Sequence, residues 1–354
     1  MDEFRKICPT NYVHNRLRDH INRYLREKIF KKPYLFGFKK GHFDLVYGNT
    51  IATVTLALHL KKAWGVPVIM HVHQSTIGAY PILNVKKSFQ SFDSYLAVSE
   101  LTKKMLIADF DIDPTKITIQ YPISYWVNQY MSGGQTLESC QIGGDSVIIG
   151  LCSYISWIKS SDLFPFIIKR FFTKYPEANC KFVFICRFIN DTDKIHFEYD
   201  LEKLGVQDKN TLIEDVNPLP YYKRFDIFLM PSREESFSLS AQEAALMETP
   251  VVGFEGVTGA EEWLKNEGAI FVPYLDIEKL TDALYLLFSD KELRHQLGSK
   301  GKHIVMEMLE KAFKKEAVVQ AISRFDIVRQ EMRTAKTTIN VSIETIFTSS
   351  DAVP

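Results

Sequence analysis

Short apolar segments alternate with helical segments along most of this chain, and that alternation limits its fold more than any other feature. Val66–His73 and Phe225–Met230 are apolar runs of strand length, whereas Thr50–Trp64 and Lys291–Phe313 are rich in helix formers. Strands that alternate with helices form parallel sheets. The other strands are expected at Asp44–Gly48, Ser94–Ser99, Lys116–Tyr121, Val147–Leu151, Lys181–Cys186, Thr211–Glu214, Pro250–Phe254 and Ala269–Pro273.

One Gly- and Ser-rich stretch interrupts this alternation. Met131–Asp145, MSGGQTLESCQIGGD, has little periodicity and indicates a linker. We therefore predict an α/β chain of two Rossmann-like, doubly wound domains that face one another across a cleft. The first spans residues 1–130, the linker 131–145, the second domain 146–330 and a tail 331–354. The cleft is the default place for a ligand.

Composition excludes several classes of protein. The 354 residues carry no net charge, which argues against a nucleic-acid-binding protein. Five scattered cysteines without a CxxC pair indicate a reducing compartment and argue against a disulfide framework or a zinc site. No apolar run has the length of a membrane span, and the N-terminus lacks a signal-peptide core. These features predict a cytoplasmic protein.

The segment PSREESFSLSAQEAALMETPVV, Pro231–Val252, reads as a loop, a helix and the start of a strand, and an apolar strand precedes it. The loop after the carboxyl end of a parallel strand is where ligands bind, and a helix N-terminus favours an anion. Glu235 lies in that loop, and Glu243 lies in the helix. The ordinary explanation of Glu243 is a capping box, with Ser240 as N-cap and Glu243 at the third helical position.

REESFSLSAQEA followed by PVV resembles the Glu-x7-Glu signature of the family 4 glycosyltransferases. That family is retaining, adopts the GT-B fold and uses nucleotide-sugar donors. The segments DLVYGNTIATVTLALHLKKAWGVPVIMHVHQ, SYLAVSELTKK, IGLCSYISWIKSSDLF and GVTGAEEWLKNEGAIFVPYLD resemble the family in the expected order, over about residues 43–325. The resemblance makes the first domain the acceptor side and the second the donor side.

The resemblance implies two catalytic residues. Glu235 would meet hydroxyls of the donor sugar near the anomeric centre, and His73 would face the reacting sugar from the first domain. A core or surface position is the alternative for His73, because His71 lies on the same face of the strand two residues earlier.

The resemblance also implies donor-binding groups. Glu243 would accept hydrogen bonds from the ribose hydroxyls, and Lys159 would place a cation on the diphosphate. The family usually has an arginine a few residues before this lysine, where this chain has Cys152 and Ser153, and Arg187 would take its role. The backbone N–H groups of Phe237, Ser238 and Leu239 would bind the diphosphate. The alternative for Lys159 is a solvated lysine at the start of a helix.

Two carboxylate pairs resemble the metal-binding Asp-x-Asp of the other major glycosyltransferase fold. Asp109–Asp113, DFDID, is expected after a helix, and Asp191–Asp193, DTD, is expected in a loop away from the signature. We therefore expect no metal and no cofactor. A dinucleotide-dependent dehydrogenase is excluded, because no G-x-G-x-x-G follows any strand.

Together these features predict a retaining, metal-independent glycosyltransferase that uses a nucleoside-diphosphate sugar. The acceptor would be a glycan or a lipid-linked sugar in cell-surface polysaccharide or lipopolysaccharide synthesis. Serines replace family glycines at Ser236 and Ser238, and the first strand and Gly-rich loop of the family are expected to be missing. The alternative is a non-catalytic nucleotide-sugar-binding relative with an incomplete acceptor domain.

The first 50 residues hold eleven Lys and Arg against five Asp and Glu. Within His14–Lys40, the basic residues are interleaved with Tyr24, Phe30 and Phe36. Such a segment is either a helix packed on the first domain or a contact to an anionic membrane surface. In the second case the protein would be peripheral at the inner face of the membrane.

Overall fold

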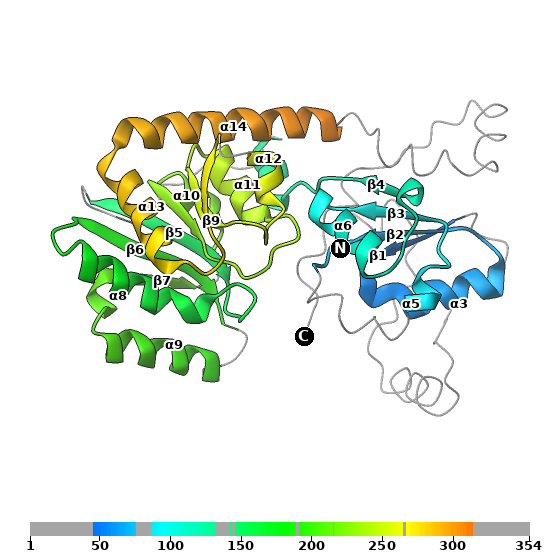
Figure 1. Cartoon of the computed structure of the whole chain (residues 1–354), viewed down its shortest axis with the longest axis horizontal. Helices are drawn as coiled ribbons and strands as arrows, with labels where there is room; N and C mark the ends of the chain where they lie inside the picture. Colours follow the sequence, from blue (N-terminus) through cyan, green and yellow to red (C-terminus); the bar gives the residue numbers. More distant parts are fainter. Residues whose placement is uncertain are drawn as a thin grey trace. The chain divides into compact units, whose positions relative to one another are not determined.

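A computed structural model of the chain describes residues 45–75, 86–131, 142, 146–188, 191–214, 216–264 and 267–313. These residues form two compact units. The first holds residues 45–97 and 103–120, and the second holds residues 98–102 and the described residues from 121 onward. Each unit is built on a parallel sheet with helices, so the predicted α/β fold is confirmed (Figure 1).

The first unit is a sheet of four parallel strands in the order β1-β2-β3-β4. Its strands are β1 (Val46–Asn49), β2 (Val68–Val72), β3 (Ser94–Ala97) and β4 (Ile117–Ile119). Its helical segments are η2 (Ile51–Thr53), α3 (Val54–Trp64), α5 (Lys86–Phe89), the greater part of α6 (Glu100–Ala108) and η4 (Pro114–Lys116). Among the described strands of this unit, neighbours in the sheet are also neighbours in the sequence.

Local chemistry explains these elements. All five residues of β2 are buried, as expected of a strand covered on both faces. Helix α3 ends at Gly65, whose φ of 71° is the left-handed conformation that glycine adopts without cost. An aromatic cluster of Phe89, Phe92 and Tyr95 fills the core beside β3.

The second unit is a sheet of six parallel strands in the order β7-β6-β5-β8-β9-β10. Its strands are β5 (Val147–Tyr154), β6 (Cys180–Arg187), β7 (Asn210–Glu214), β8 (Ile227–Met230), β9 (Val251–Phe254) and β10 (Ala269–Val272). The chain therefore begins in the middle, proceeds to one edge, and returns to build the other half. This is the Rossmann strand order, and the direction reverses between β5 and β8.

Two layers of helices cover this sheet (Figure 1). One layer consists of α8 (Phe164–Lys174), α9 (Asp191–Leu204) and α13 (Ile277–Ser289), and the other includes α10 (Leu219–Tyr222), α11 (Leu239–Leu246), α12 (Ala260–Leu264) and α14 (Lys291–Phe313). The remaining helical segments are α7 (Tyr125–Met131), η5 (Ser161–Leu163) and η6 (Gln207–Lys209). Phe164, Phe171, Phe182, Phe184 and Phe197 fill the core under the first layer.

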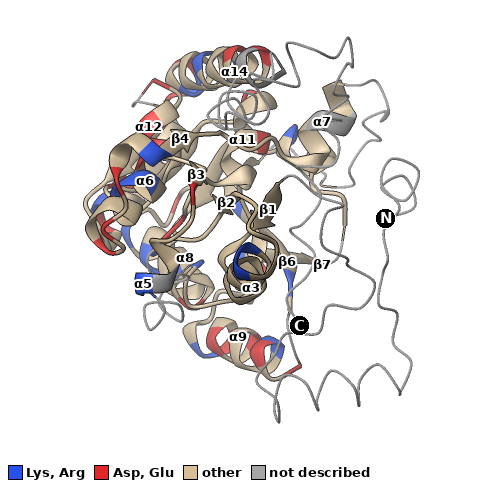
Figure 2. Cartoon of the chain, turned by 90° about the vertical axis from the view of Figure 1, so that its right-hand side faces the viewer, with Lys and Arg blue, Asp and Glu red and all other residues tan. Residues whose placement is uncertain are grey.

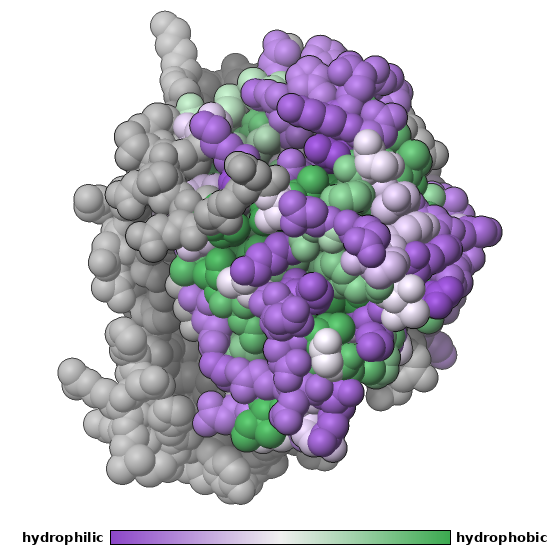
Figure 3. Space-filling view, turned by 90° about the vertical axis from the view of Figure 1, so that its left-hand side faces the viewer, coloured by the Kyte–Doolittle hydropathy of each residue, from purple (hydrophilic) through white to green (hydrophobic). Residues whose placement is uncertain are grey.

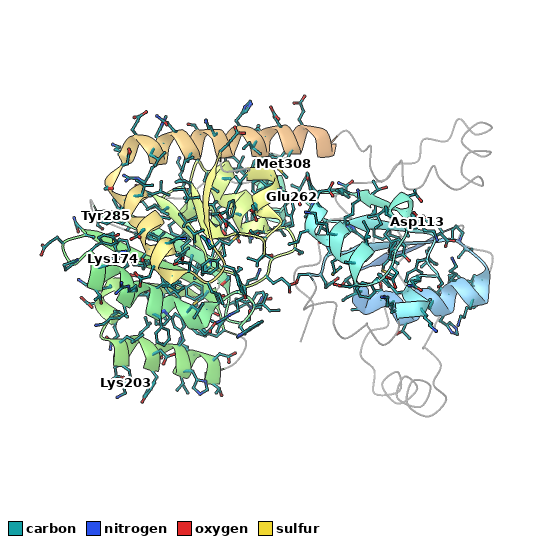
Figure 4. The ribbon with its side chains drawn as sticks, in the orientation of Figure 1. Asp113, Lys174, Lys203, Glu262, Tyr285 and Met308 are labelled. Atoms are coloured by element: carbon teal, nitrogen blue, oxygen red, sulfur yellow. The ribbon has the colours of Figure 1, made fainter. Side chains whose placement is uncertain are left out.

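The surface of the second unit carries both signs of charge, which alternate along α9 and α14 (Figure 2). Near the amino ends of the strands, the rings of Tyr175 and Tyr285 stack with centroids 3.7 Å apart, and Lys174 lies 2.5 Å from Asp282. Lys174 and Tyr285 are labelled in Figure 4. Figure 3 shows that face, on which hydrophilic residues surround smaller apolar patches.

The structure changes two details of the prediction. Asp191–Asp193 begins helix α9 and does not lie in a loop. Helix α7, which starts at Tyr125, belongs to the second unit, although the predicted first domain extends to residue 130.

Three predicted segments cannot be compared with the structure. Residues 14–40, the tail 331–354 and nearly all of the predicted linker lie outside the described residues. In the part that is described, no helix is long and apolar enough to cross a membrane.

Candidate active site

Two loops leave the sheet of the second unit at its reversal point, one after β5 and one after β8. Arg233, in the second loop, joins them. Its backbone N–H donates to Ile158 O at 2.8 Å, and its guanidinium donates to Trp157 O at 2.8 Å and to both carboxylate oxygens of Asp162 at 2.7 and 2.8 Å. The two loops therefore form one fixed surface.

Lys159 and Glu235 form an ion pair between these loops. Their side chains are only 18% and 12% exposed, so both groups are largely shielded from solvent. Burial lowers the pKa of Lys159, but the charge and hydrogen bond of Glu235 raise it further, and the net effect is a raised pKa. The interpretation of Lys159 as a solvated surface lysine is therefore wrong.

The loop that carries Glu235 is also held from its other side. Glu235 N–H donates to Val257 O at 2.8 Å, and Gly259 N–H donates to Glu235 O at 2.9 Å. A Cβ on Gly259 would lie 2.3 Å from Ser236 O and 3.0 Å from Phe237 Cα, so no larger residue fits there. Backbone contacts therefore fix the position of the Glu235 carboxylate.

The N-terminus of α11 follows directly. Its N-cap is Ser238, whose hydroxyl accepts from Ala241 N–H at 3.2 Å, and not Ser240 as the capping-box interpretation requires. That interpretation of Glu243 is therefore wrong. Within the described residues, the N–H groups of Phe237, Ser238 and Leu239 have no hydrogen-bond partner. A helix N-terminus with free N–H groups favours an anion.

Ser238 occupies a strained conformation, with φ at 71°. Side chains with a Cβ adopt this region at a cost, whereas glycine adopts it freely. The sequence resemblance places a glycine at this position in the family, and the structure supplies a backbone reason for that preference.

Glu243 lies inside α11 and is only 6% exposed. Burial raises the pKa of Glu243 to about 7, while the hydrogen bond donated by the Ser124 hydroxyl acts in the opposite direction. The neighbouring Gln242 accepts from Ser124 N–H at 2.9 Å and donates to Pro122 O at 3.1 Å. Two adjacent polar side chains of α11 therefore hold the segment that leads into α7.

Cys152 and Tyr222 lie beside Glu243. Burial and the charge of Glu243 raise the pKa of the Cys152 thiol to about 12, so this thiol stays protonated. The Tyr222 hydroxyl is buried and has no hydrogen bond of normal geometry among the described residues. No sequence pattern indicated Ser124, Cys152 or Tyr222 as neighbours of Glu243, because each approaches it only through tertiary structure.

His73 directly follows β2 and belongs to the first unit, whereas Glu235 belongs to the second unit. Its Nε2 lies 2.7 Å from Asn49 Oδ1, and its ring centroid lies 4.0 Å from that of His71. The two rings therefore share one face of the strand, as predicted. Burial lowers the pKa of His73 to about 4, so its imidazole is neutral at physiological pH.

The remaining candidates differ in their surroundings. Arg187 is the exposed last residue of β6, and it pairs in register with Tyr154 at the end of β5. Asp113 accepts from Thr115 N–H at 2.9 Å as the N-cap of η4, and Asp111 lies 2.7 Å from Lys86. Among the described residues, no group of three His, Cys, Asp or Glu could hold a metal ion.

Two family models match the chain, one over the region of the first unit and the other within the second unit. Residues 11–122 match the family model Glycosyltransferase Family 4, and residues 171–304 match the model Glycosyl transferases group 1. The chain is a GT-B glycosyltransferase of the family 4-like type. The first match includes residues 11–42, which the sequence motifs alone do not reach.

The fold is similar to those of solved glycosyltransferases. The structure of Anabaena HepE in complex with UDP and glucose superposes on this chain with a TM-score of 0.65 at 13% sequence identity. The aligned residues are 80% of this chain and 78% of the HepE chain. Sucrose-phosphate synthase from Thermosynechococcus elongatus superposes with a TM-score of 0.62 at 14% sequence identity. The aligned residues are 83% of this chain and 75% of the synthase chain.

Curated relatives are more distant in sequence. A D-inositol 3-phosphate glycosyltransferase of Kribbella flavida is 22% identical over 299 residues, which are 77% of this chain and 68% of the relative. The capsular polysaccharide biosynthesis glycosyltransferase CapM of Staphylococcus aureus is 30% identical over 93 residues, 26% of this chain and 24% of the relative.

Proposed function

We propose that this glycosyltransferase is a retaining, metal-independent enzyme that transfers a sugar from a nucleoside diphosphate to a glycan or a lipid-linked acceptor. The observation that carries the proposal is the Lys159–Glu235 pair at the reversal point of the second sheet, beside the free N–H groups that precede α11. Since solved relatives contain UDP or UDP-glucose, a UDP-sugar is the first donor to test.

The chemistry of the leaving group explains this arrangement. A departing nucleoside diphosphate gains negative charge, which fixed positive groups stabilise in the transition state. Lys159 would supply a charge, and the N–H groups of Phe237, Ser238 and Leu239 would supply oriented donors. Glu235 would otherwise repel the diphosphate, but the ammonium of Lys159 lies against it and would separate the two anions. Glu235 would thus hold Lys159 in place and receive hydroxyls of the donor sugar.

Three groups would complete the site. Glu243 would bind the ribose hydroxyls, Arg187 would add positive charge at the end of β6, and His73 would meet the donor sugar from the first unit. A neutral His73 suits that contact, because an imidazole of pKa about 4 exchanges hydrogen bonds with hydroxyls without carrying a charge.

Turnover of UDP-sugars with saccharide and lipid-linked acceptors tests this function, with EDTA present and absent. Release of UDP with EDTA present and retention of the anomeric configuration in the product are the expected results. A strict requirement for manganese or magnesium would contradict metal independence and direct attention to Asp109, Asp111 and Asp113.

The alternative candidate is a nucleotide-sugar-binding protein without transferase activity. UDP binding without turnover on any acceptor would favour that alternative. A pathway in cell-surface polysaccharide synthesis is proposed from CapM, to which part of the chain is similar. The first unit would serve the acceptor, and the second unit the donor.

Attachment to an anionic membrane surface through residues 14–40, with the protein otherwise cytoplasmic, remains a separate proposal. Co-sedimentation with vesicles containing phosphatidylglycerol tests it, because screening by salt weakens such binding. Neutralisation of Arg23, Arg26, Lys28, Lys31 and Lys32 would abolish binding and leave UDP affinity unchanged. Failure of the wild-type protein to co-sediment at low salt would show the proposal to be wrong.

A further inference from the structure

Two large aromatic side chains are exposed beside the Lys159–Glu235 pair. Trp157 is 56% exposed, and Tyr154, at the end of β5, is 44% exposed. The ring centroid of Tyr154 lies 5.7 Å from Lys159 Nζ, and Trp157 precedes Lys159 by two residues. Aromatic rings usually contribute buried apolar area to a fold, so two exposed rings at the edge where ligands bind indicate a contact surface.

The Trp157 indole is held in place by a network that does not depend on a ligand. The guanidinium carbon of Arg233 lies 4.8 Å from its ring centroid, within the range of a cation–π contact. Arg233 is itself fixed, because it donates to Trp157 O and to both oxygens of Asp162, and its side chain is only 9% exposed. A surface that is ordered before binding loses little conformational entropy when a ligand arrives.

The position of Trp157 selects the kind of ring that would stack on it. In the proposed function, Lys159 and Glu235 meet the diphosphate and the donor sugar, whereas Glu243 meets the ribose. Trp157 shares a turn with Lys159, so it would lie toward the sugar end of the donor and away from the base. The C–H edges of a pyranose ring suit the negative face of an indole, and its hydroxyls suit the neighbouring carboxylate.

We propose that Trp157, assisted by Tyr154, is a stacking platform for a saccharide ring next to the Lys159–Glu235 pair. The proposal deepens the proposed function and rests on it for the identity of the neighbouring groups. The ring is either the donor sugar or a sugar of the acceptor, and both present the same chemistry to the indole.

Chemical shifts of the tryptophan indole N–H groups test the platform without any need for turnover. The chain has four tryptophans, and Trp157→Phe identifies the resonance of Trp157. The protein is titrated with UDP, with UDP-glucose, and with glucose, N-acetylglucosamine and maltotriose in the presence of UDP. A Trp157 shift with UDP-glucose that exceeds the shift with UDP identifies the donor sugar, and a shift with a free saccharide identifies the acceptor.

Kinetics supply the second measurement. Trp157→Ala is expected to raise the KM of one saccharide substrate about tenfold, which corresponds to about 1.4 kcal/mol, and Trp157→Phe is expected to retain most of the affinity. The Kd of UDP stays within twofold. The control is Tyr199→Ala on α9, since Tyr199 is also 56% exposed and lies 5.1 Å from Lys203 Nζ.

Two outcomes would overturn the platform. One is an equal Trp157 shift with UDP and UDP-glucose, together with a weaker UDP Kd in Trp157→Ala, because the indole would then stack on the base. The other is the absence of a shift with every saccharide. A saccharide-induced shift without turnover would instead contradict the proposed transferase activity and leave the platform standing.

Discussion

The amino edges of the two sheets are closed in the same way, whereas their carboxyl edges differ. In the first unit, Asp93 N–H donates to Val68 O at 3.1 Å, and Val68 N–H donates to the Asp93 carboxylate at 2.8 Å. In the second unit, Asp226 and Ile148 exchange the same two hydrogen bonds at 2.9 and 2.8 Å. An aspartate before a strand thus pairs with the start of the neighbouring strand in both sheets.

Each unit also has a half-buried lysine paired with a carboxylate, but at opposite ends of the strands. Lys61 lies 2.5 Å from Asp93 at the amino edge of the first sheet, where it ties the end of α3 to the sheet. Lys159 pairs with Glu235 at the carboxyl edge of the second sheet, between two loops. The same kind of ion pair therefore stabilises the fold at the amino edge of the first sheet, and we propose that it binds the donor at the carboxyl edge of the second.

Strand order explains the difference. The second sheet reverses between β5 and β8, and a ligand binds outside the carboxyl ends of the strands at such a reversal point. Among the described strands of the first unit, the order is sequential and contains no such reversal.

The largest expected effect comes from Glu235→Gln. Turnover should fall about 100- to 1,000-fold, the loss seen when one preorganised polar group is removed from a reacting centre. The Kd of UDP should change little, because the amide oxygen of glutamine still accepts a hydrogen bond from Lys159 and UDP lacks the sugar that Glu235 contacts. Steady-state kinetics and calorimetry measure the two quantities, and Glu234→Ala is the control at the neighbouring acid. Equal losses of turnover and UDP affinity would contradict the assignment.

Glu243→Gln separates the buried carboxylate from the paired one. A carboxyl pKa raised from 4.5 to about 7 means that the folded state binds more protons than the unfolded state between these values. Its contribution to stability is therefore lost as the pH rises through 7, by roughly 3 kcal/mol at most.

The Gln variant should accordingly be more stable than the wild type at pH 8 and about equally stable at pH 4.5. It should also bind UDP more weakly, since an amide accepts hydrogen bonds from ribose hydroxyls less well than a carboxylate does. Thermal unfolding at several pH values and UDP calorimetry check both results. A variant with lower stability at pH 8 and unchanged UDP affinity would show that Glu243 is a structural residue.

Asp226→Ala tests the shared amino-edge contact. Ile148 is fully buried, so removal of the carboxylate leaves its N–H unsatisfied, at a cost of about 1–3 kcal/mol. Asp93→Ala should cost a similar amount through Val68. Both variants should lower the melting temperature and leave the kcat of folded protein unchanged. A specific loss of kcat in either variant would break the division between structural and functional edges.

The smallest effect concerns the cap of α11. Ser238→Ala should destabilise the protein by about 1 kcal/mol through loss of the cap, whereas Ser238→Gly should cost only a few tenths, because glycine relieves the left-handed backbone. Ser240→Ala should be nearly silent in thermal unfolding. A larger loss for Ser240→Ala than for Ser238→Ala would restore Ser240 as the N-cap.

Local patterns predicted much of this fold. Helix α14 has the predicted bounds, Lys291–Phe313, because this long run is rich in helix formers. Asp191 and Asp193 were expected in a loop, yet acidic residues also suit the first turn of a helix, where they face its positive end.

The site was predictable only in part. Glu235 and Glu243 stand out in a motif of contiguous residues, so the sequence alone identified them as candidates. The contact of Lys159 with Glu235 spans 76 residues, and that of Ser124 with Glu243 spans 119. Such pairs depend on strand order, which no local pattern encodes. Ser238 was missed as the N-cap because its left-handed conformation is rare for serine.

Calorimetric titration with UDP tests the central claim most directly, with Lys159→Met compared with Lys61→Met. The two variants remove the same ammonium from a half-buried ion pair, one at each kind of sheet edge. We expect Lys159→Met to weaken UDP binding by at least tenfold and Lys61→Met to leave it within twofold of the wild type, at a temperature where both are folded. Equal affinities in the two variants would contradict the claim that the carboxyl edge of the second sheet binds the donor.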